Sequence, residues 1–519
     1  MQYDSRVTSQ KWTILLCGMH SIRIELRGAD FNSANILKQQ DCSMVHSLTS
    51  QSDSSTPKNP EADSEPDSDS SPWRCKVAKP WLSALFPSDV NSGTLKAKAV
   101  AALVATALAC LSLARVFGAG ATNTIWAEDG KVFYEDSLHI SPARALVTPY
   151  NGYLHFAPRV LAALSRCVPL DYLSTFFAIS GALATSLLAV FVWVASRPLL
   201  EQAALRVAVA APVALTWVAQ SELGNNVVDL QWYLLYAAFW AALWNVESIS
   251  GRLVAASVIF CSIASDPLTL LYLPLLFARI WVLRSRRDWM LALGVVLGGT
   301  YQGYGAVFMS SLSSRPADKR YDPVWSAWGY VINVLGRAFW SGPGHQVVSI
   351  IFACVLAGVA FRCPPSARRH PLVVSSIVFS IILYGALTLS GGAFAERYAA
   401  PSSALLIAGV AGVAAEEGLS VDVVALMQKQ LGKLLCAIVA ACVALGFASG
   451  TDAQLRGKGK PWSSQLDQAE VFCTRPGADF ATMATAPSGK GWTVTVPCQL
   501  VLHRDDWFQT GLYANQQPR

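Results

Sequence analysis

The sequence predicts an all-α polytopic membrane protein with about eleven transmembrane helices. Of its 519 residues, 53% are hydrophobic and only 14% are charged, whereas soluble domains carry about 25% charged residues. The mean hydropathy is +0.37. The apolar residues form continuous blocks of about 17 to 22, which is the length of a helix that crosses a bilayer core. Because the blocks do not alternate, helices are expected rather than a barrel.

Residues 1–95 are expected to form a disordered cytoplasmic region. The stretch from Ser47 to Ser71 is rich in Ser, Asp, Glu and Pro, and such a composition cannot bury enough apolar surface to offset its ordering entropy. An over-extended start codon is the alternative origin of these residues. Around Trp81 and Phe86 the pattern predicts a short amphipathic helix on the inner membrane face.

Residues 96–450 form the predicted transmembrane domain, with long exterior loops at 119–170 and 310–345. The spans are expected at 97–118, 172–195, 205–219, 227–244, 253–263, 268–283, 289–309, 347–361, 372–389, 403–415 and 434–448. The short loops at 197–206, 252, 284–287, 362–369 and 429–433 are basic, which places them in the cytoplasm by the positive-inside rule. The amino terminus is then cytoplasmic and the carboxyl terminus exterior, in a plasma membrane.

Residues 451–519 are expected to form a small exterior segment that contains some β structure. Trp492, Val494 and Val496 alternate with polar residues, a pattern typical of a strand. Cys473 and Cys498 lie in this polar segment, unlike most of the 12 cysteines, which lie in or beside apolar spans. A disulfide between them fits an oxidising compartment; two unpaired thiols are the alternative.

The first exterior loop carries two acidic pairs soon after the first span. Its sequence contains Trp126-Ala127-Glu128-Asp129 and then Tyr134-Glu135-Asp136. A carboxylate among aromatic residues at the membrane surface suits a general base or a divalent-cation ligand; alternatively, these acids only solvate the loop. From about Phe156 to Leu164 an amphipathic interfacial helix is predicted, and it would cover such a site.

This arrangement resembles the GT-C superfamily of membrane glycosyltransferases, which use polyprenyl-phosphate sugars to build bacterial cell-envelope glycans. The likeness covers residues 97 to 450 and the small exterior segment, and the layout is similar to that of the arabinofuranosyl- and mannosyltransferase branches. In that superfamily an acid of the first exterior loop activates the acceptor hydroxyl. The resemblance therefore implies Asp129 as the first choice of base and Glu128 as the second.

A lipid phosphate needs a cation at the outer surface. Arg397, in Phe394-Ala395-Glu396-Arg397-Tyr398, lies at the expected outer mouth between the ninth and tenth spans, and Arg offers planar bidentate donors for phosphate. The resemblance also implies a phosphate-binding Arg in the late exterior loops. The alternative is a snorkelling Arg paired with Glu396. The other candidates are Lys319, Arg320 and Arg337.

A polar cluster lies at the outer end of the fourth predicted span. Asn226, Asp229 and Gln231 are candidates for binding sugar hydroxyls, and Trp232 for stacking on a sugar face. Polar groups at this depth are costly unless they face a cavity or a partner, so hydrogen bonding between helices is the alternative. His155 either orients the substrate or merely occupies the interface.

Several motifs are absent from the sequence. There is no Gly-Lys-Ser/Thr phosphate loop, no His-Glu-x-x-His and no Cys-x-x-Cys, so ATP-driven transport, zinc proteolysis and thiol redox chemistry lack their residues. The net charge of +6 is spread over short loops and does not indicate nucleic-acid binding. No cofactor is certain, although a divalent cation is a candidate and its ligands are unknown.

The expected function is transfer of a sugar from a polyprenyl-phosphate donor to an envelope glycan or lipid acceptor. A multi-pass transporter or flippase for lipid-linked sugars is the main alternative. Transporters tend to have repeated halves and polar breaks near the bilayer midplane, whereas the polar residues here cluster at the outer ends. A non-catalytic envelope scaffold is the third interpretation.

Overall fold

The computed structural model describes residues 80–89, 95–215, 217–219, 221–308, 323–338, 370–391, 396–415, 455–489 and 491–507, with a few single helical positions between 347 and 441. The chain divides into two units, 1–70 and 71–519, and every described residue belongs to the second. The segment predicted to be disordered, 47–71, therefore lies outside the described residues. So do most residues of the predicted spans at 347–361 and 434–448.

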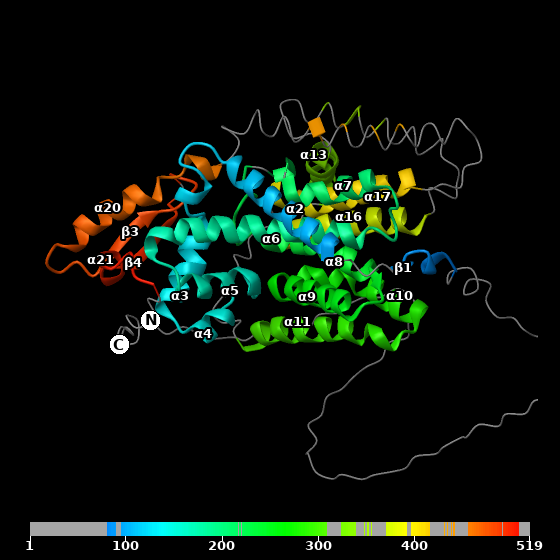
Figure 1. Ribbon diagram of the computed structural model, residues 1–519, viewed down its shortest axis with the longest axis horizontal. Helices are drawn as coiled ribbons and strands as arrows, with labels where there is room; N and C mark the ends of the chain where they lie inside the picture. Colours follow the sequence, from blue (N-terminus) through cyan, green and yellow to red (C-terminus); the bar gives the residue numbers. More distant parts are fainter. Residues whose placement is uncertain are drawn as a thin grey trace, which may run out of the picture. The chain divides into compact units, whose positions relative to one another are not determined.

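The second unit is mostly helical (Figure 1). Helices long and apolar enough to cross a membrane are α2 (Leu95–Ala114), α6 (Leu173–Ala195), α11 (Trp289–Phe308), α16 (Pro371–Gly391) and α17 (Glu396–Ala415). Shorter apolar helices are α7 (Ala203–Leu215), α8 (Leu230–Leu243), α9 (Ile249–Ser265) and η5 (Pro267–Tyr272) with α10 (Leu273–Leu283). The predicted helical architecture is confirmed, and five of the described helices have the length and composition to cross a membrane; the count of eleven spans stays a prediction.

Helix α8 is the centre of the bundle, because all its residues are buried. It packs against α6, α9 and α17, while α16 packs on α17 and α11 on α9. The last contact uses the glycines of a G-x-x-x-G pattern: a Cβ on Gly294 would lie 2.7 Å from the Ala256 carbonyl oxygen, and one on Gly298 2.8 Å from Ile263 Cβ. Small residues let helices approach closely where lipid supplies no hydrophobic driving force.

Large apolar side chains lie exposed on the outer helices. On α2, Leu103 is 69% exposed, and on α11 Val307 and Phe308 are 69% and 68% exposed. Such side chains on long apolar helices fit contact with lipid acyl chains.

Short helices fill the first long loop. They are η1 (Ala121–Asn123), the π-helix η2 (Asp129–Tyr134), α3 (Glu135–His139), α4 (Pro142–Leu146), α5 (Phe156–Ser165) and η3 (Leu170–Tyr172). The predicted amphipathic helix is present as α5, which packs on η2, α6 and α9. In the second long loop the described elements are α12 (Pro323–Gly329), the π-helix η8 (Tyr330–Leu335) and α13 (Gly336–Ala338).

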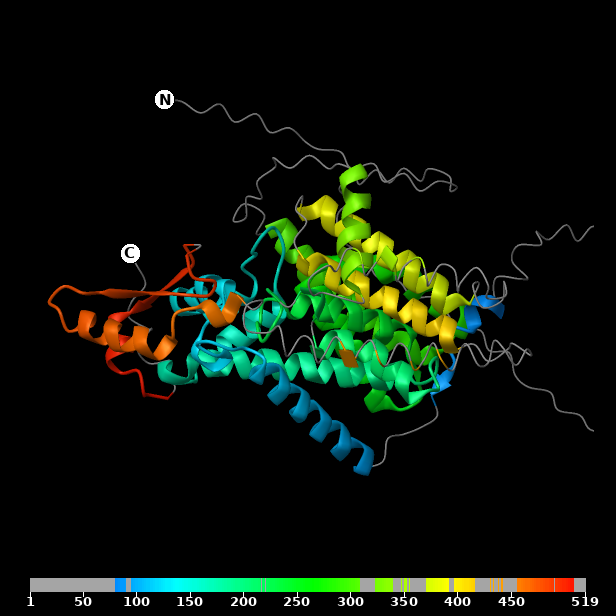
Figure 2. The same ribbon diagram turned by 90° about the horizontal axis from the view of Figure 1, so that it is seen from above.

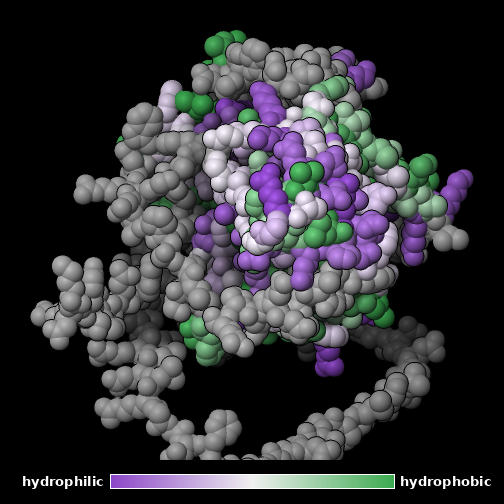
Figure 3. Space-filling view, turned by 90° about the vertical axis from the view of Figure 1, so that its left-hand side faces the viewer, coloured by the Kyte–Doolittle hydropathy of each residue, from purple (hydrophilic) through white to green (hydrophobic). Residues whose placement is uncertain are grey.

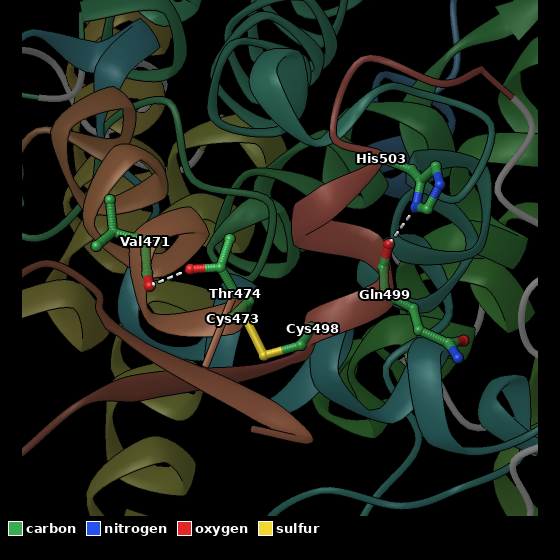
Figure 4. Close-up of a disulfide and its surroundings, with 6 residues drawn as sticks. All are labelled: Val471, Cys473, Thr474, Cys498, Gln499 and His503. Atoms are coloured by element: carbon green, nitrogen blue, oxygen red, sulfur yellow. Dashed lines mark hydrogen bonds between the residues drawn. A yellow bond between two sulfur atoms is a disulfide. The ribbon is translucent and has the colours of Figure 1, made fainter. Parts of the chain in front are cut away.

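The carboxyl-terminal segment lies beside the helices of the first long loop, at one end of the bundle (Figures 1 and 2). It contains η9 (Leu455–Lys458), α20 (Trp462–Cys473), the antiparallel pair β3 (Phe480–Ala484) and β4 (Thr493–Pro497), and α21 (Cys498–Leu502). The predicted strand is therefore present as β4. A disulfide joins Cys473 to Cys498 and ties α20 to α21 (Figure 4).

Main-chain contacts fix this segment to the first loop. The amide of Ala119 donates to the Gly457 carbonyl (3.2 Å), and the amide of Ala486 donates to the Ile125 carbonyl (2.7 Å). At the first contact, a Cβ on Gly118 would lie 2.4 Å from the Gly457 oxygen. Hydrophilic residues prevail on the coloured part of the surface in Figure 3, which looks onto this end.

Residues 80–89 differ from the predicted disorder of 1–95. A helical turn at 80–83 leads to β1 (Ser88–Asp89), which pairs in parallel with β2 (Asn245–Val246) at the other end of the bundle. Leu85 and Phe86 are buried, and buried Asp89 accepts hydrogen bonds from Arg197 and Trp244. These contacts hold residues 85–89 against the bundle, so the described fold includes part of the region expected to be disordered.

Candidate functional site

A cavity of about 140 Å³ opens where the first loop meets the beginning of α8 and α17. Its lining combines acidic, basic and aromatic side chains. The lining residues are Glu128, Tyr150, Asn151, Tyr153, His155, Val228, Asp229, Gln231, Trp232, Asp266, Pro267, Leu268, Leu387, Arg397 and Tyr398. The structure thus brings together six of the residues selected from the sequence. A few convergent polar groups in a concave pocket are typical of small-molecule sites.

Glu128 is the acid of the first-loop motif that reaches this cavity. It directly precedes η2 and is half-buried. Burial raises the pKa of Glu128, and the positive charge of Arg397 partly offsets this effect. A carboxylate with a raised pKa beside a cavity has the properties of a general base.

Asp129 points away from the cavity and into the protein. Its side chain is fully buried, and its two carboxylate oxygens accept the backbone amides of Val227 (3.0 Å) and Val228 (2.9 Å). Burial raises the pKa of Asp129 to about 7, although the Val227 amide and nearby Arg456 act in the opposite direction. The carboxylate therefore holds the chain segment that forms one wall of the cavity.

We expect Asp129→Ala to destabilise the protein. Two buried amides would lose their acceptor, at about 1–3 kcal/mol each, so the free energy of unfolding should fall by about 2–6 kcal/mol. Thermal unfolding of the detergent-solubilised protein measures this, with Glu128→Ala as the matched control that should change it little. Unchanged unfolding together with lost activity in Asp129→Ala would instead make Asp129 the reacting acid.

Arg397 lies on the cavity wall at the beginning of α17. It forms an ion pair with Glu222 (3.2 Å) and remains 31% exposed. Glu396 instead pairs with Arg337 (2.7 Å) and accepts a hydrogen bond from Ser221. The predicted alternative, an Arg397–Glu396 pair, is therefore absent. Arg337 is not among the lining residues, and Lys319 and Arg320 lie outside the described part of the chain.

The polar cluster before and within α8 forms the opposite wall. Asp229 accepts hydrogen bonds from Asn226 Nδ2 (2.9 Å) and Trp232 Nε1 (3.2 Å), and Gln231 Oε1 accepts one from the Tyr153 hydroxyl (3.2 Å). The Trp232 ring lies edge-on to that of Tyr398, with centroids 5.3 Å apart. Asn226 lies behind this wall and does not line the cavity.

His155 is buried between aromatic rings, with its centroid 4.2 Å from that of Tyr153. Burial lowers the pKa of His155 to about 3, so the imidazole is neutral at physiological pH. Its Nε2 lies 3.1 Å from the Tyr150 carbonyl oxygen, which can only accept. Nε2 therefore carries the proton, and Nδ1 is a hydrogen-bond acceptor.

Two residues that the sequence analysis did not select support the site. Gln302, in α11, donates to the carbonyls of Leu154, Ile263 and Ala264 and accepts the Leu154 amide; a lone amide within an apolar block is the signal that indicates it. Arg456, in the carboxyl-terminal segment, is buried against the first loop, and no local pattern marks it.

The described residues contain no group of three or more His, Cys, Asp or Glu side chains placed to hold a metal ion. Comparison with protein-family models finds no match for this chain, and comparison with curated proteins finds none either. The geometry of the cavity is therefore what supports a functional assignment.

Proposed function

We propose that the protein is a GT-C-type glycosyltransferase of the plasma membrane. It transfers a sugar from a polyprenyl-phosphate donor to a glycan or lipid acceptor of the cell envelope. The observation that carries the proposal is that a carboxylate with a raised pKa, Glu128, and a guanidinium, Arg397, line the same cavity. Sugar transfer from a phosphate donor needs these two groups, one at each side of the anomeric carbon.

In the proposed reaction Glu128 takes the proton of the acceptor hydroxyl. The acceptor oxygen forms a bond to the anomeric carbon while the bond from that carbon to the phosphate oxygen breaks, with inversion. The bonding electrons leave with the polyprenyl phosphate, and Arg397 stabilises its added negative charge. Trp232 and Tyr398 offer aromatic rings to the sugar, and Asp229 offers acceptors to its hydroxyls. His155 lines the same cavity, but its Nδ1 atom is buried and does not reach the sugar.

The proposed site faces the exterior. The disulfide-bonded segment packs on the same loop as the cavity, and disulfides persist in oxidising compartments. At the other end of the bundle, Arg197 lies in one of the short basic loops and pairs with Asp89, which fits a cytoplasmic end. In this proposed orientation, a lipid-linked donor of the outer leaflet would approach the cavity from the side of Arg397.

The test is transfer of radiolabel from a panel of polyprenyl-phosphate sugars in membranes that contain the wild-type protein. At least one donor should label an envelope acceptor, and the sugar identifies the enzyme's specificity. If no donor supports transfer while labelled lipid crosses protein-containing vesicles, the protein is a flippase and the proposal fails.

A further inference from the structure

The cavity's acidic wall is connected to a residue that is far away in the sequence. Arg456, in η9 of the carboxyl-terminal segment, is 2% exposed. Its guanidinium makes five hydrogen bonds, which matches its full number of N–H donors. The acceptors are the carbonyls of Ala121, Thr124 and Asn225, the Thr124 hydroxyl and the Asn226 side chain.

One of these bonds leads directly to the cavity. Arg456 Nη1 donates to Asn226 Oδ1 (2.7 Å), which turns the amide so that Asn226 Nδ2 donates to Asp229 Oδ2 (2.9 Å). The other oxygen of Asp229 accepts from Trp232 (3.2 Å). Both Asp229 and Trp232 line the cavity. A hydrogen-bonded chain therefore runs from the exterior segment to the sugar-facing wall.

We infer that Arg456 is a positioning residue: through Asn226 it fixes Asp229 and Trp232 in the arrangement that holds the sugar for transfer. This inference rests on the proposed function. Arg is required because its planar fork reaches both loops, at 121–124 and 225–226, whereas the ammonium of Lys provides three donors at a single point. The exterior segment is then a part of the active site and not only a cover.

The test compares Arg456→Lys and Asn226→Ala, singly and together, with Arg504→Met as control. Arg504 also joins the segment to the first loop, through an ion pair with Asp171, and it pairs with Asp467 and Glu470 within the segment; it does not line the cavity. We expect kcat to fall about 10- to 100-fold in each of the two site variants, because small misplacements of binding groups cost this much. The KM for the donor lipid should change little, and Arg504→Met should keep kcat.

The double variant should be no slower than the slower single variant, because both changes break one chain of contacts. If the fall in kcat of the double variant equals the product of the two single falls, the inference is overturned. An equal fall in kcat in Arg504→Met would also overturn it, because Arg456 would then only attach the segment.

Hydrogen–deuterium exchange tests the same link without activity. Arg456→Lys should speed exchange of the amides at 225–230 in the detergent-solubilised protein, whereas Arg504→Met should speed exchange only within 455–507. Exchange confined to 455–507 in both variants would overturn the inference. Absence of any sugar transfer by the wild type would overturn the proposed function. The exchange result would still show whether Arg456 is coupled to residues 225–230.

Discussion

Replacing Glu128 with glutamine should lower kcat for sugar transfer by about 10²- to 10⁴-fold, the usual contribution of a general base. Glutamine keeps the size and the hydrogen-bonding reach of the side chain but cannot take a proton. Initial rates with saturating donor measure the effect, and Glu201→Gln, a change of an exposed glutamate, is the matched control. Full activity in Glu128→Gln would exclude this residue as the base.

The same residue sets the expected pH dependence. Burial raises the pKa of Glu128, and only the ionised carboxylate accepts the proton. Activity of the wild type should therefore be low below this raised pKa and rise as the pH passes through it. If the pH–activity profile of the wild type lacks this rise while the protein stays equally stable, Glu128 is not the general base.

Replacing Arg397 with methionine should lower kcat by about 10²- to 10³-fold, the range for loss of one group that stabilises developing charge. Arg397→Lys should recover part of the rate, because it restores the charge but not the planar pair of donors. Arg337→Met is the matched control: Arg337 also pairs with a glutamate, Glu396, but lies off the cavity.

An equal fall in kcat in Arg337→Met and Arg397→Met would indicate a general effect on the packing of the helices. A loss in Arg397→Met that Glu222→Gln reproduces would mean that the ion pair itself is what the enzyme needs. Only a loss specific to Arg397 supports contact with the leaving phosphate.

Local signals were sufficient to predict most of the described helices. Apolar blocks predicted α6 and α11 within one residue of their observed ends, and alternation predicted β4. Such patterns are visible in the sequence because a helix that crosses a bilayer needs a continuous run of apolar residues, and a half-buried strand needs alternate ones. The disorder predicted for 1–95 extended too far, since residues 80–89 are ordered by β2, which lies about 155 residues later in the chain.

The site itself was only partly predictable. Residue type and position at the ends of predicted spans selected the acidic pair of the first loop, Arg397 and the cluster at 226–232. The sequence could not distinguish Glu128 from Asp129, because the two acids are adjacent and have the same neighbours along the chain. The side chain of Glu128 reaches the cavity, whereas that of Asp129 is held in the interior by the amides of Val227 and Val228. Only the tertiary structure brings these amides to Asp129.

The link between Thr124 and Arg456 spans 332 residues. At a synthesis rate of about 5–20 residues per second, the first loop leaves the ribosome roughly 20–60 s before its partner. During that interval the carbonyls at 121–124 must remain with water or with another protein. A chain that stops before Arg456 would lack the hydrogen bonds that this guanidinium donates to the loops at 121–124 and 225–226, and nothing would fix the acidic wall from that side. Under the proposed function, the site is therefore complete only after the carboxyl-terminal segment has been synthesised and has folded against the first loop.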